Sequence, residues 1–456
     1  MTPILVFLFW VFPAGGHDEP RRWDPFLDTL ETRTINWFLD VTPKNTGLTP
    51  DRWSERIASE PSSPSSIAAV GFALTTYPIA VERHIISRAE AAKRALATLR
   101  FLWSLPQDKT RTTIAGYKGF FYHFIDTKTG FRAWNCELST IDTGLLIAGA
   151  LFCQSYFVKR DAVELEIRAL ADSLYRRIDW RWAMGDTSGI WMGWTPEEGW
   201  SPLTWYGYNE AMTVYILALG SPTHPVPSSV WQHWTAPYEW AKNFGQEYLQ
   251  FGPLFGHQYS HAWIDFRGIR DAYMKDKGID YFENSRRATY ASRAYAIDNP
   301  GRWKDYSDSI WGLTACDGPR DTTVEAYGRV RRFQTYSARG SSQDWTNDDG
   351  TIAPTAAGAS LPFAPEICIP ALKAMRSKYG DHLWTKYGFV DAFNPSYPTP
   401  GGWFDHDYLG IDQGPIVLMT ENLRNGFVWE VMKKNSYVVD GLRKAGFAGG
   451  WLDAAR

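Results

Sequence analysis

Apolar residues recur at helical spacing through most of the chain. Asp24 followed by Pro25 is the pair of residue types that favours a helix start, and apolar positions continue from there to Phe38. The same criterion predicts helices at 67–77, 87–103, 138–157, 161–178, 207–219, 228–246, 262–275, 285–297, 364–379, 414–424 and 427–445. The pattern therefore predicts about twelve helices.

One segment breaks this pattern. Residues 112–135 alternate aromatic and polar positions around the turn sequence DTKTG, which predicts strand or loop at the rim of a cleft. No strand–helix alternation follows, and loops on alternate connections carry aromatic and acidic residues, so we predict an all-α fold in which the helices form a toroid. No linker or repeat divides the chain, and a single catalytic domain is expected at 17–456.

The run from Ile190 to Gly220 joins an aromatic, acidic loop to an apolar helix. Its aromatic residues offer flat faces for the C–H groups of sugars, and we select Trp194, Trp205, Tyr206 and Tyr208 as substrate-binding candidates. Glu210 stands at the start of the helical stretch, which ends at Gly220, a natural helix C-cap. Glu210 is thus a candidate proton donor; alternatively, it is a first-turn acid that the helix dipole favours.

Hydrolysis of a glycosidic bond requires a second carboxyl group. Asp412, in the sequence GIDQGP, is the first candidate, and capping of the following helix is its structural alternative. Asp405 and Asp407 are further choices, and Trp403 beside them is a candidate sugar contact. In WNCELSTIDTG, Glu137 and Asp142 could bond sugar hydroxyls or order a catalytic water, or hold structural roles.

A third group lies in GHQYSHAWIDFRG. His257, His261 and Asp265 follow at four-residue steps, a spacing that superficially suggests a metal site. Hydrogen bonding to sugar fits the aromatic context better, and hydrogen-bonded core histidines are an equal alternative. Asp317, in a DGP turn, could present its oxygen to a sugar hydroxyl.

Longer stretches carry a family resemblance. MGWTPEEGW, GYNEAM, LALGSPTHPV, PLFGHQYSHAWIDFRG, GLTACDGP, DDGTIAPTAAGASLPFAPEICIPAL, GGWFDHDYLGIDQGPIVLMTEN and NGFVW together resemble the bacterial endo-β-1,2-glucanase family, whose catalytic region is glucoamylase-like. The resemblance implies an (α/α)6 toroid that hydrolyses β-1,2-glucan, or its sophoro-oligosaccharides, with inversion and without a metal or organic cofactor. It also implies Glu210 as general acid and Asp412 on the base side, where the water path can run through a substrate hydroxyl.

Three rival functions remain open at this point. The same toroid could release a disaccharide from the end of a β-1,2-glucan, or hydrolyse an α-glucan as a glucoamylase does. A non-catalytic glycan-binding protein would also account for the aromatic excess of 23 Trp, 23 Tyr and 25 Phe, although it would not need so many clustered acids.

Composition and missing motifs exclude other classes. The formal net charge of −3 argues against nucleic acid as a partner. Neither a GxSxG elbow, nor a GKS or GKT phosphate loop, nor an HExxH pair occurs, which disfavours serine hydrolases, NTPases and zincins. Four cysteines without metal-ligand spacing predict buried thiols, with one long-range disulfide as the alternative.

The first residues predict export. An apolar run from Ile4 to Phe12 followed by small residues resembles a signal peptide at 1–16, so a secreted or periplasmic protein is expected. The basic n-region is missing, which leaves a mis-called start codon or a truncated signal as the alternative. No later segment has the length and hydropathy of a membrane span, and a monomer without a membrane partner is expected.

Overall fold

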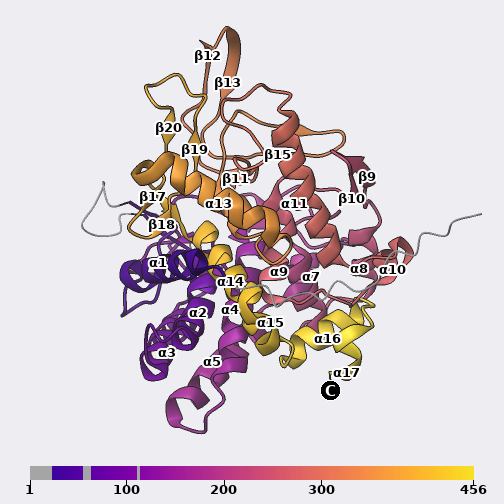
Figure 1. Cartoon of the computed structure of the whole chain (residues 1–456). Coiled ribbons are helices and arrows are strands. Elements are labelled where there is room, and N and C mark those ends of the chain that lie inside the picture. Colours follow the sequence, from indigo (N-terminus) through magenta and orange to yellow (C-terminus); the bar gives the residue numbers. More distant parts are fainter. Residues whose placement is uncertain (1–22, 55–62, 110–112, 456) are drawn as a thin grey trace, which may run out of the picture.

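The computed structural model describes residues 23–54, 63–109 and 113–455, so the predicted signal peptide at 1–16 lies outside the described residues (Figure 1). Helices dominate the fold, and the strands are short pieces in the loops between them. The α-helices are α1 (Pro25–Val41), α2 (Ile67–Glu82), α3 (Arg88–Ser104), α4 (Thr140–Tyr156), α5 (Ala162–Arg177), α6 (Trp180–Met184), α7 (Met212–Gly220), α8 (Ser229–Thr235), α9 (Tyr259–Trp263), α10 (Ala272–Lys277), α11 (Tyr281–Asp298), α12 (Pro354–Gly358), α13 (Pro365–Tyr379), α14 (Gly410–Asn425), α15 (Phe427–Met432), α16 (Ser436–Lys444) and α17 (Gly450–Ala454), with 3-10 turns at η1 (Leu254–His257) and η2 (Gly380–His382).

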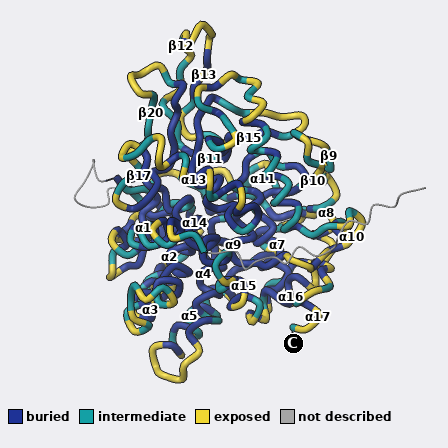
Figure 2. Tube along the Cα trace, viewed as in Figure 1, coloured by how far each residue is buried: buried dark blue, intermediate teal, exposed yellow. Residues whose placement is uncertain are grey.

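Helices α2, α4, α7, α9, α12 and α14 are almost wholly buried. By contrast, α1, α3, α5, α11, α13 and α16 bury only one face. A helix that is apolar all round requires cover on every side, whereas an amphipathic helix supplies such cover from outside. The buried helices therefore form the interior, which is dark blue at the centre of Figure 2.

Glycines allow the closest helix contacts. A Cβ atom on Gly149 of α4 would lie 2.1 Å from the carbonyl oxygen of Gly71 in α2, so neither position accepts a side chain without movement. Gly220 has a similar role, because its Cβ would lie 2.1 Å from the carbonyl oxygen of Tyr437 in α16. The prediction that Gly220 is a C-cap is wrong: it is the last residue of α7, and Ser221 is the cap.

Three predicted helices are interrupted, and one of them, 427–445, divides into α15 and α16. The stretch 228–246 is helical only to Thr235, and then forms a hairpin from β9 (Trp240–Asn243) and β10 (Gln246–Leu249). Phe244 and Gly245 both have positive φ between these strands, as a tight hairpin turn requires. The stretch 262–275 is also interrupted, since α9 ends at Trp263 and α10 begins only after Asp271, which caps it.

Short strand pairs join the loops that lead into the buried helices. The strands are β1 (Arg52–Trp53), β2 (Ser65–Ser66), β3 (Gly116–Tyr117), β4 (Phe120–Phe121), β5 (Phe124–Ile125), β6 (Leu138–Ser139), β7 (Gly193–Thr195), β8 (Gly199–Trp200), β11 (Ala315–Cys316), β12 (Thr322–Ala326), β13 (Arg329–Phe333), β14 (Ser337–Ala338), β15 (Gly340–Ser341), β16 (Thr346–Asn347), β17 (Trp384–Thr385), β18 (Gly388–Phe389), β19 (Phe393–Asn394), β20 (Trp403–Phe404) and β21 (Tyr408–Leu409). β1 pairs with β21, β2 with β5 and β6 with β7, so segments far apart in sequence meet at the start of α14, α2 and α4. Strands β3 to β5 confirm the prediction of strand or loop at 112–135 for the residues described there.

The structure bears on the predictions made for the cysteines and for membrane-spanning segments. Cys153, Cys316 and Cys368 are buried thiols and Cys136 is a half-buried one, all without a disulfide. Within the described part of the chain, no helix combines the length and the hydropathy needed to span a bilayer.

Candidate active site

Glu210 lies in the turn that leads into α7. The side-chain oxygen of Asn209 accepts a hydrogen bond from the N–H of Ala211 at 2.9 Å, and the Ser260 hydroxyl donates to the Glu210 carbonyl oxygen at 3.1 Å. The turn is thus fixed to both α7 and α9. Glu210 precedes the first helical residue, Met212. The alternative prediction, in which Glu210 is an acid in the first turn of the helix, is therefore wrong.

The Glu210 carboxyl has the environment of a proton donor. Its Oε2 atom is buried without a hydrogen-bond partner among the described residues. Burial raises the pKa of Glu210 to about 7, and the negative charge of Asp142 acts in the same direction. The group can therefore hold a proton near neutral pH.

Asp412 is the third residue of α14 and is buried, with 4% of its surface exposed. The N-cap of α14 is Leu409. The alternative prediction that Asp412 caps this helix is therefore wrong. Its Oδ2 atom has no hydrogen-bond partner in the described regions. Burial raises the pKa of Asp412, the charges of Asp317 and Asp51 add to this, and a hydrogen bond with Asp391 opposes it.

Asp391 is a site residue that the sequence did not reveal. It is buried, and its Oδ2 accepts a hydrogen bond from the N–H of Asp317 at 2.7 Å. Burial and the neighbouring Asp412 raise the pKa of Asp391 well above its ordinary value. A hydrogen bond between two carboxyls needs one proton, and these shifts place it on Asp391, which donates to Asp412.

Arg52 holds a group of acids beside this pair. Its Nη1 lies 2.6 Å from Asp317 and 3.4 Å from Asp407, and its Nε lies 3.2 Å from Asp51. Single carboxylate oxygens of Asp317, Asp405 and Asp407 lie within 4.8 Å of one another, close enough to share a cation. Since the Arg52 guanidinium already binds two of them, these acids have a positive partner without a metal.

Tyr259 connects the two sides of the site. This residue of α9 is 8% exposed, and its hydroxyl donates to the carbonyl oxygen of Ile411 at 3.3 Å. Burial raises the pKa of Tyr259 well above 10, and the charges of Asp412, Glu210 and Asp142 raise it further. The charges of the candidate acid, the candidate base and a predicted substrate-binding acid therefore all act on the hydroxyl of one tyrosine.

Glu137 and Asp142 meet through His123, which the sequence also did not reveal. The Nδ1 atom of His123 lies 3.0 Å from Glu137 and Nε2 lies 3.5 Å from Asp142. Burial lowers the pKa of His123, but the two carboxylates have the larger effect and raise this pKa to about 9. Asp142 also has a structural role, because its carboxylate accepts a hydrogen bond from the Ser139 hydroxyl, which caps α4 by accepting from the Asp142 N–H at 3.1 Å.

The predicted aromatic contacts divide into exposed and buried groups. Tyr206 is 55% exposed, whereas Trp205 is buried and its indole N–H donates to Thr140 at 2.9 Å. Tyr208 is buried against Tyr281. Trp194 in β7 and Trp403 in β20 are half-buried. Tyr206 thus has the most open ring, and Trp205 mainly fixes the loop.

His257 and His261 lie in the core, which favours the structural alternative for both. His257 Nε2 contacts the carbonyl oxygen of Phe251 at 3.1 Å, and His261 Nε2 contacts the Ser285 hydroxyl at 3.1 Å. Burial lowers the pKa of His257 to about 4 and that of His261 to about 3. Asp265 lies beyond the end of α9 and pairs with Arg267, so the four-residue spacing does not align these side chains on one helix.

Comparisons with known proteins agree with this picture. A curated relative, the exo beta-1,2-glucooligosaccharide sophorohydrolase (non-reducing end) of Parabacteroides distasonis, is 26% identical over 93% of this chain. The chain spans only 58% of the length of that relative.

Two solved structures match along nearly their whole length. A putative glucoamylase from Bacteroides uniformis has 30% sequence identity and a TM-score of 0.80, over 95% of this chain and 100% of the other. An endo-beta-1,2-glucanase from Chitinophaga pinensis, in complex with sophorotriose and glucose, has 27% sequence identity and a TM-score of 0.81, over 93% of this chain and 98% of the other. The family model described as "Putative glucoamylase" matches residues 202–436. The chain therefore belongs to this glucoamylase-like family.

Proposed function

We propose that the protein is a glycoside hydrolase that cleaves β-1,2-linked glucan with inversion of configuration. The observation that carries this proposal is the arrangement of Glu210 and Asp412. Each has a buried carboxylate oxygen without a hydrogen-bond partner among the described residues. The negative charges of both raise the pKa of Tyr259. Two carboxyl groups with different proton occupancy are what glycoside hydrolysis requires.

In the proposed reaction, Glu210 starts protonated and gives its proton to the glycosidic oxygen as the bond to the anomeric carbon breaks. Asp412 starts as the carboxylate and accepts a proton from water, directly or through a substrate hydroxyl, as the water oxygen bonds to the anomeric carbon. Because water attacks the face opposite the leaving oxygen, the configuration inverts. The hydrogen bond from Asp391 favours the ionised form of Asp412, because it opposes the rise of the Asp412 pKa that burial causes.

The substrate is inferred from the relatives. The family description alone would fit an α-glucan, but the curated relative and the Chitinophaga pinensis structure are both named for β-1,2-glucan substrates. We therefore assign β-1,2-glucan or its oligosaccharides as the substrate.

We also propose the (α/α)6 toroid as the architecture. The buried helices α2, α4, α7, α9, α12 and α14 supply six inner members, and the amphipathic helices outside them supply the outer ring. The proposal places Asp142, Glu210 and Asp412 at the N-terminal ends of inner helices, and treats residues 17–456 as one catalytic domain.

Removal of a disaccharide from the chain end is the second candidate, because the curated relative is named as an exo enzyme. Product analysis separates the possibilities. Linear β-1,2-glucan, starch, cellulose and laminarin should be incubated with the protein and the products sized over time. Mixed oligosaccharides from β-1,2-glucan alone support endo cleavage, and a disaccharide as the sole early product supports exo cleavage. Comparable release from starch would support the glucoamylase reading, and binding without release from any glucan would support a binding protein.

A further inference from the structure

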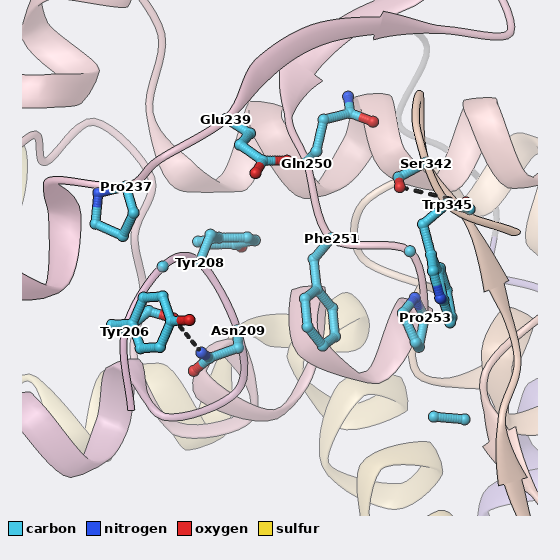
Figure 3. A pocket seen from close by; sticks show the side chains of 13 residues that line it. Tyr206, Tyr208, Asn209, Pro237, Glu239, Gln250, Phe251, Pro253, Ser342 and Trp345 are labelled. Carbon is cyan, nitrogen blue, oxygen red and sulfur yellow. Dashed lines mark hydrogen bonds between the residues drawn. The ribbon is translucent and has the colours of Figure 1, made fainter. Parts of the chain in front are cut away.

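A cavity of about 490 Å³ opens beside Asn209, the residue that precedes Glu210 (Figure 3). This volume is in the range of sites that bind small ligands. Its wall comes from four segments: the loop before α7, the loop between α8 and β9, the loop after β10, and the stretch from β14 to the turn between β15 and β16. None of the acids around Arg52 lines it, so the cavity is a neighbour of the candidate catalytic group and not a part of it.

Aromatic rings dominate this cavity. Figure 3 shows Tyr206 and Trp345 on opposite sides of the open space, with Tyr208 and Phe251 between them. Tyr206 is 55% exposed and Trp345 is 44% exposed, so both present ring surface to solvent. Exposed aromatic rings that line a concave site are suited to the C–H faces of a sugar ring, and the exposed carboxylate of Glu239 at the edge can accept hydrogen bonds from hydroxyls.

The Trp345 side of the cavity is fixed before any ligand binds. The Asn243 side-chain amide donates to the carbonyl oxygen of Ser341 at 3.1 Å, and the N–H of Gln343 donates to the side-chain oxygen of Gln250 at 3.2 Å. These bonds attach the β15–β16 turn to the β9–β10 hairpin. A preformed site loses less entropy when it binds.

Gly252 permits the position of the indole ring. A Cβ atom on Gly252 would lie 2.4 Å from the Trp345 ring, so the ring packs directly on the glycine backbone. Any side chain at 252 would displace the ring. Because Gly252 itself lines the cavity, its substitution alters this wall without touching Glu210.

We propose that this cavity binds a glucosyl unit of the substrate chain that lies away from the bond being cut, with Trp345 and Tyr206 as its ring contacts. The inference rests on the proposed function and adds the position of a distal subsite. Because Asn209 precedes Glu210 and lines the cavity, a long substrate cleaved at Glu210 would reach the cavity, whereas a short one would not. Binding energy from such a remote unit increases the rate of cleavage of long substrates.

The test compares β-1,2-gluco-oligosaccharides of increasing length. Trp345→Ala removes a ring contact, and Gly252→Ala displaces the ring. Tyr327→Ala is the control, because Tyr327 is 60% exposed in the turn of the β12–β13 hairpin. For long oligosaccharides, Trp345→Ala should lower kcat/KM about tenfold, the effect of one aromatic contact, while the shortest substrate that is cleaved keeps its wild-type value. The control should match the wild type at every length.

Two results would overturn the proposal. Wild-type kcat/KM at every length in Trp345→Ala would mean that the cavity holds no part of the substrate. An equal loss at every length would mean that Trp345 only supports the fold or the catalytic group. Thermal unfolding of each variant distinguishes loss of folding from loss of binding, and Gly252→Ala should reproduce the length dependence. Failure of the wild-type protein to cleave any of these oligosaccharides would instead refute the proposed function on which the subsite rests.

Discussion

Replacement of Glu210 with Gln tests the proton donor while preserving the shape of the side chain. Burial raises the pKa of Glu210 from 4.5 to about 7. At pH 6 the carboxyl is then about nine-tenths protonated, whereas at its ordinary pKa it would be about 3% protonated, a difference of about thirtyfold in the active form. Gln cannot donate this proton. We therefore expect kcat to fall by about two to four orders of magnitude, which raises the activation free energy by about 3–5 kcal/mol.

Initial rates of reducing-sugar release from β-1,2-glucan measure this loss, and calorimetric titration with an oligosaccharide measures whether binding survives. The control is Glu325→Gln, an exposed residue of β12 that should keep wild-type activity. The wild-type rate should also fall as the pH rises through about 7, since the acid must be protonated and its folded pKa is raised to that value. Turnover by Glu210→Gln within a few-fold of the wild type would refute the assignment.

Three further predictions concern the surroundings of the site. Asp391→Ala should move the acidic limb of the pH profile of kcat/KM to higher pH, because the pKa of Asp412 rises when its hydrogen-bond donor is lost; Asp391→Asn, which can still donate, should shift it less. Asp349→Ala should lower the free energy of unfolding by about 3–5 kcal/mol in denaturant melts, because it leaves the buried Arg339 guanidinium without its carboxylate at 2.7 Å. Treatment with EDTA should leave activity unchanged, because Arg52 already supplies positive charge to the acids that could share a cation.

Each of these predictions has a result that opposes it. An acidic limb that stays in place in Asp391→Ala would remove Asp391 from its role beside Asp412. The stability prediction has a matched control in Arg100→Ala, which breaks an exposed ion pair with Glu166 and should leave the free energy of unfolding nearly unchanged. Equal losses in the two variants would contradict the argument from burial. Restoration of EDTA-treated protein by a divalent cation would assign a metal to Asp317, Asp405 and Asp407.

The helices were predictable where a periodic stripe coincided with a clear start signal. Ser87 caps α3 and Asp161 caps α5, as side-chain hydrogen bonds to Glu90 and Glu164 demonstrate, and both helices follow the predicted ranges closely. The helix predicted at 228–246 ends at Thr235, two residues before Pro237, and the chain then reverses at the Phe244–Gly245 turn, which depends on two positive φ angles and not on apolar spacing. Periodicity reports which face is buried, and it says little where aromatic residues occupy every face.

The site was predictable only in part. Glu210 and Asp412 stood out because each lies beside turn residues at the start of an apolar helix. Asp391 and His123 carry no such local signal, since their importance comes from contacts with Asp412 and with the pair Glu137 and Asp142 that loop pairing creates. The histidines at 257 and 261 illustrate the reverse, because residue type suggested a ligand contact where the fold buries the ring.

Proton NMR of the first products from linear β-1,2-glucan tests the central claim most directly, because one spectrum reports both the linkage cleaved and the stereochemistry. The spectra should be recorded before mutarotation equilibrates the new reducing ends. The proposed reaction of Glu210 and Asp412 predicts that the α anomer appears first, since water attacks the face opposite the departing oxygen. Initial appearance of the β anomer would contradict inversion and require a covalent glycosyl-enzyme, and a spectrum without new reducing ends would contradict β-1,2-glucan hydrolysis itself.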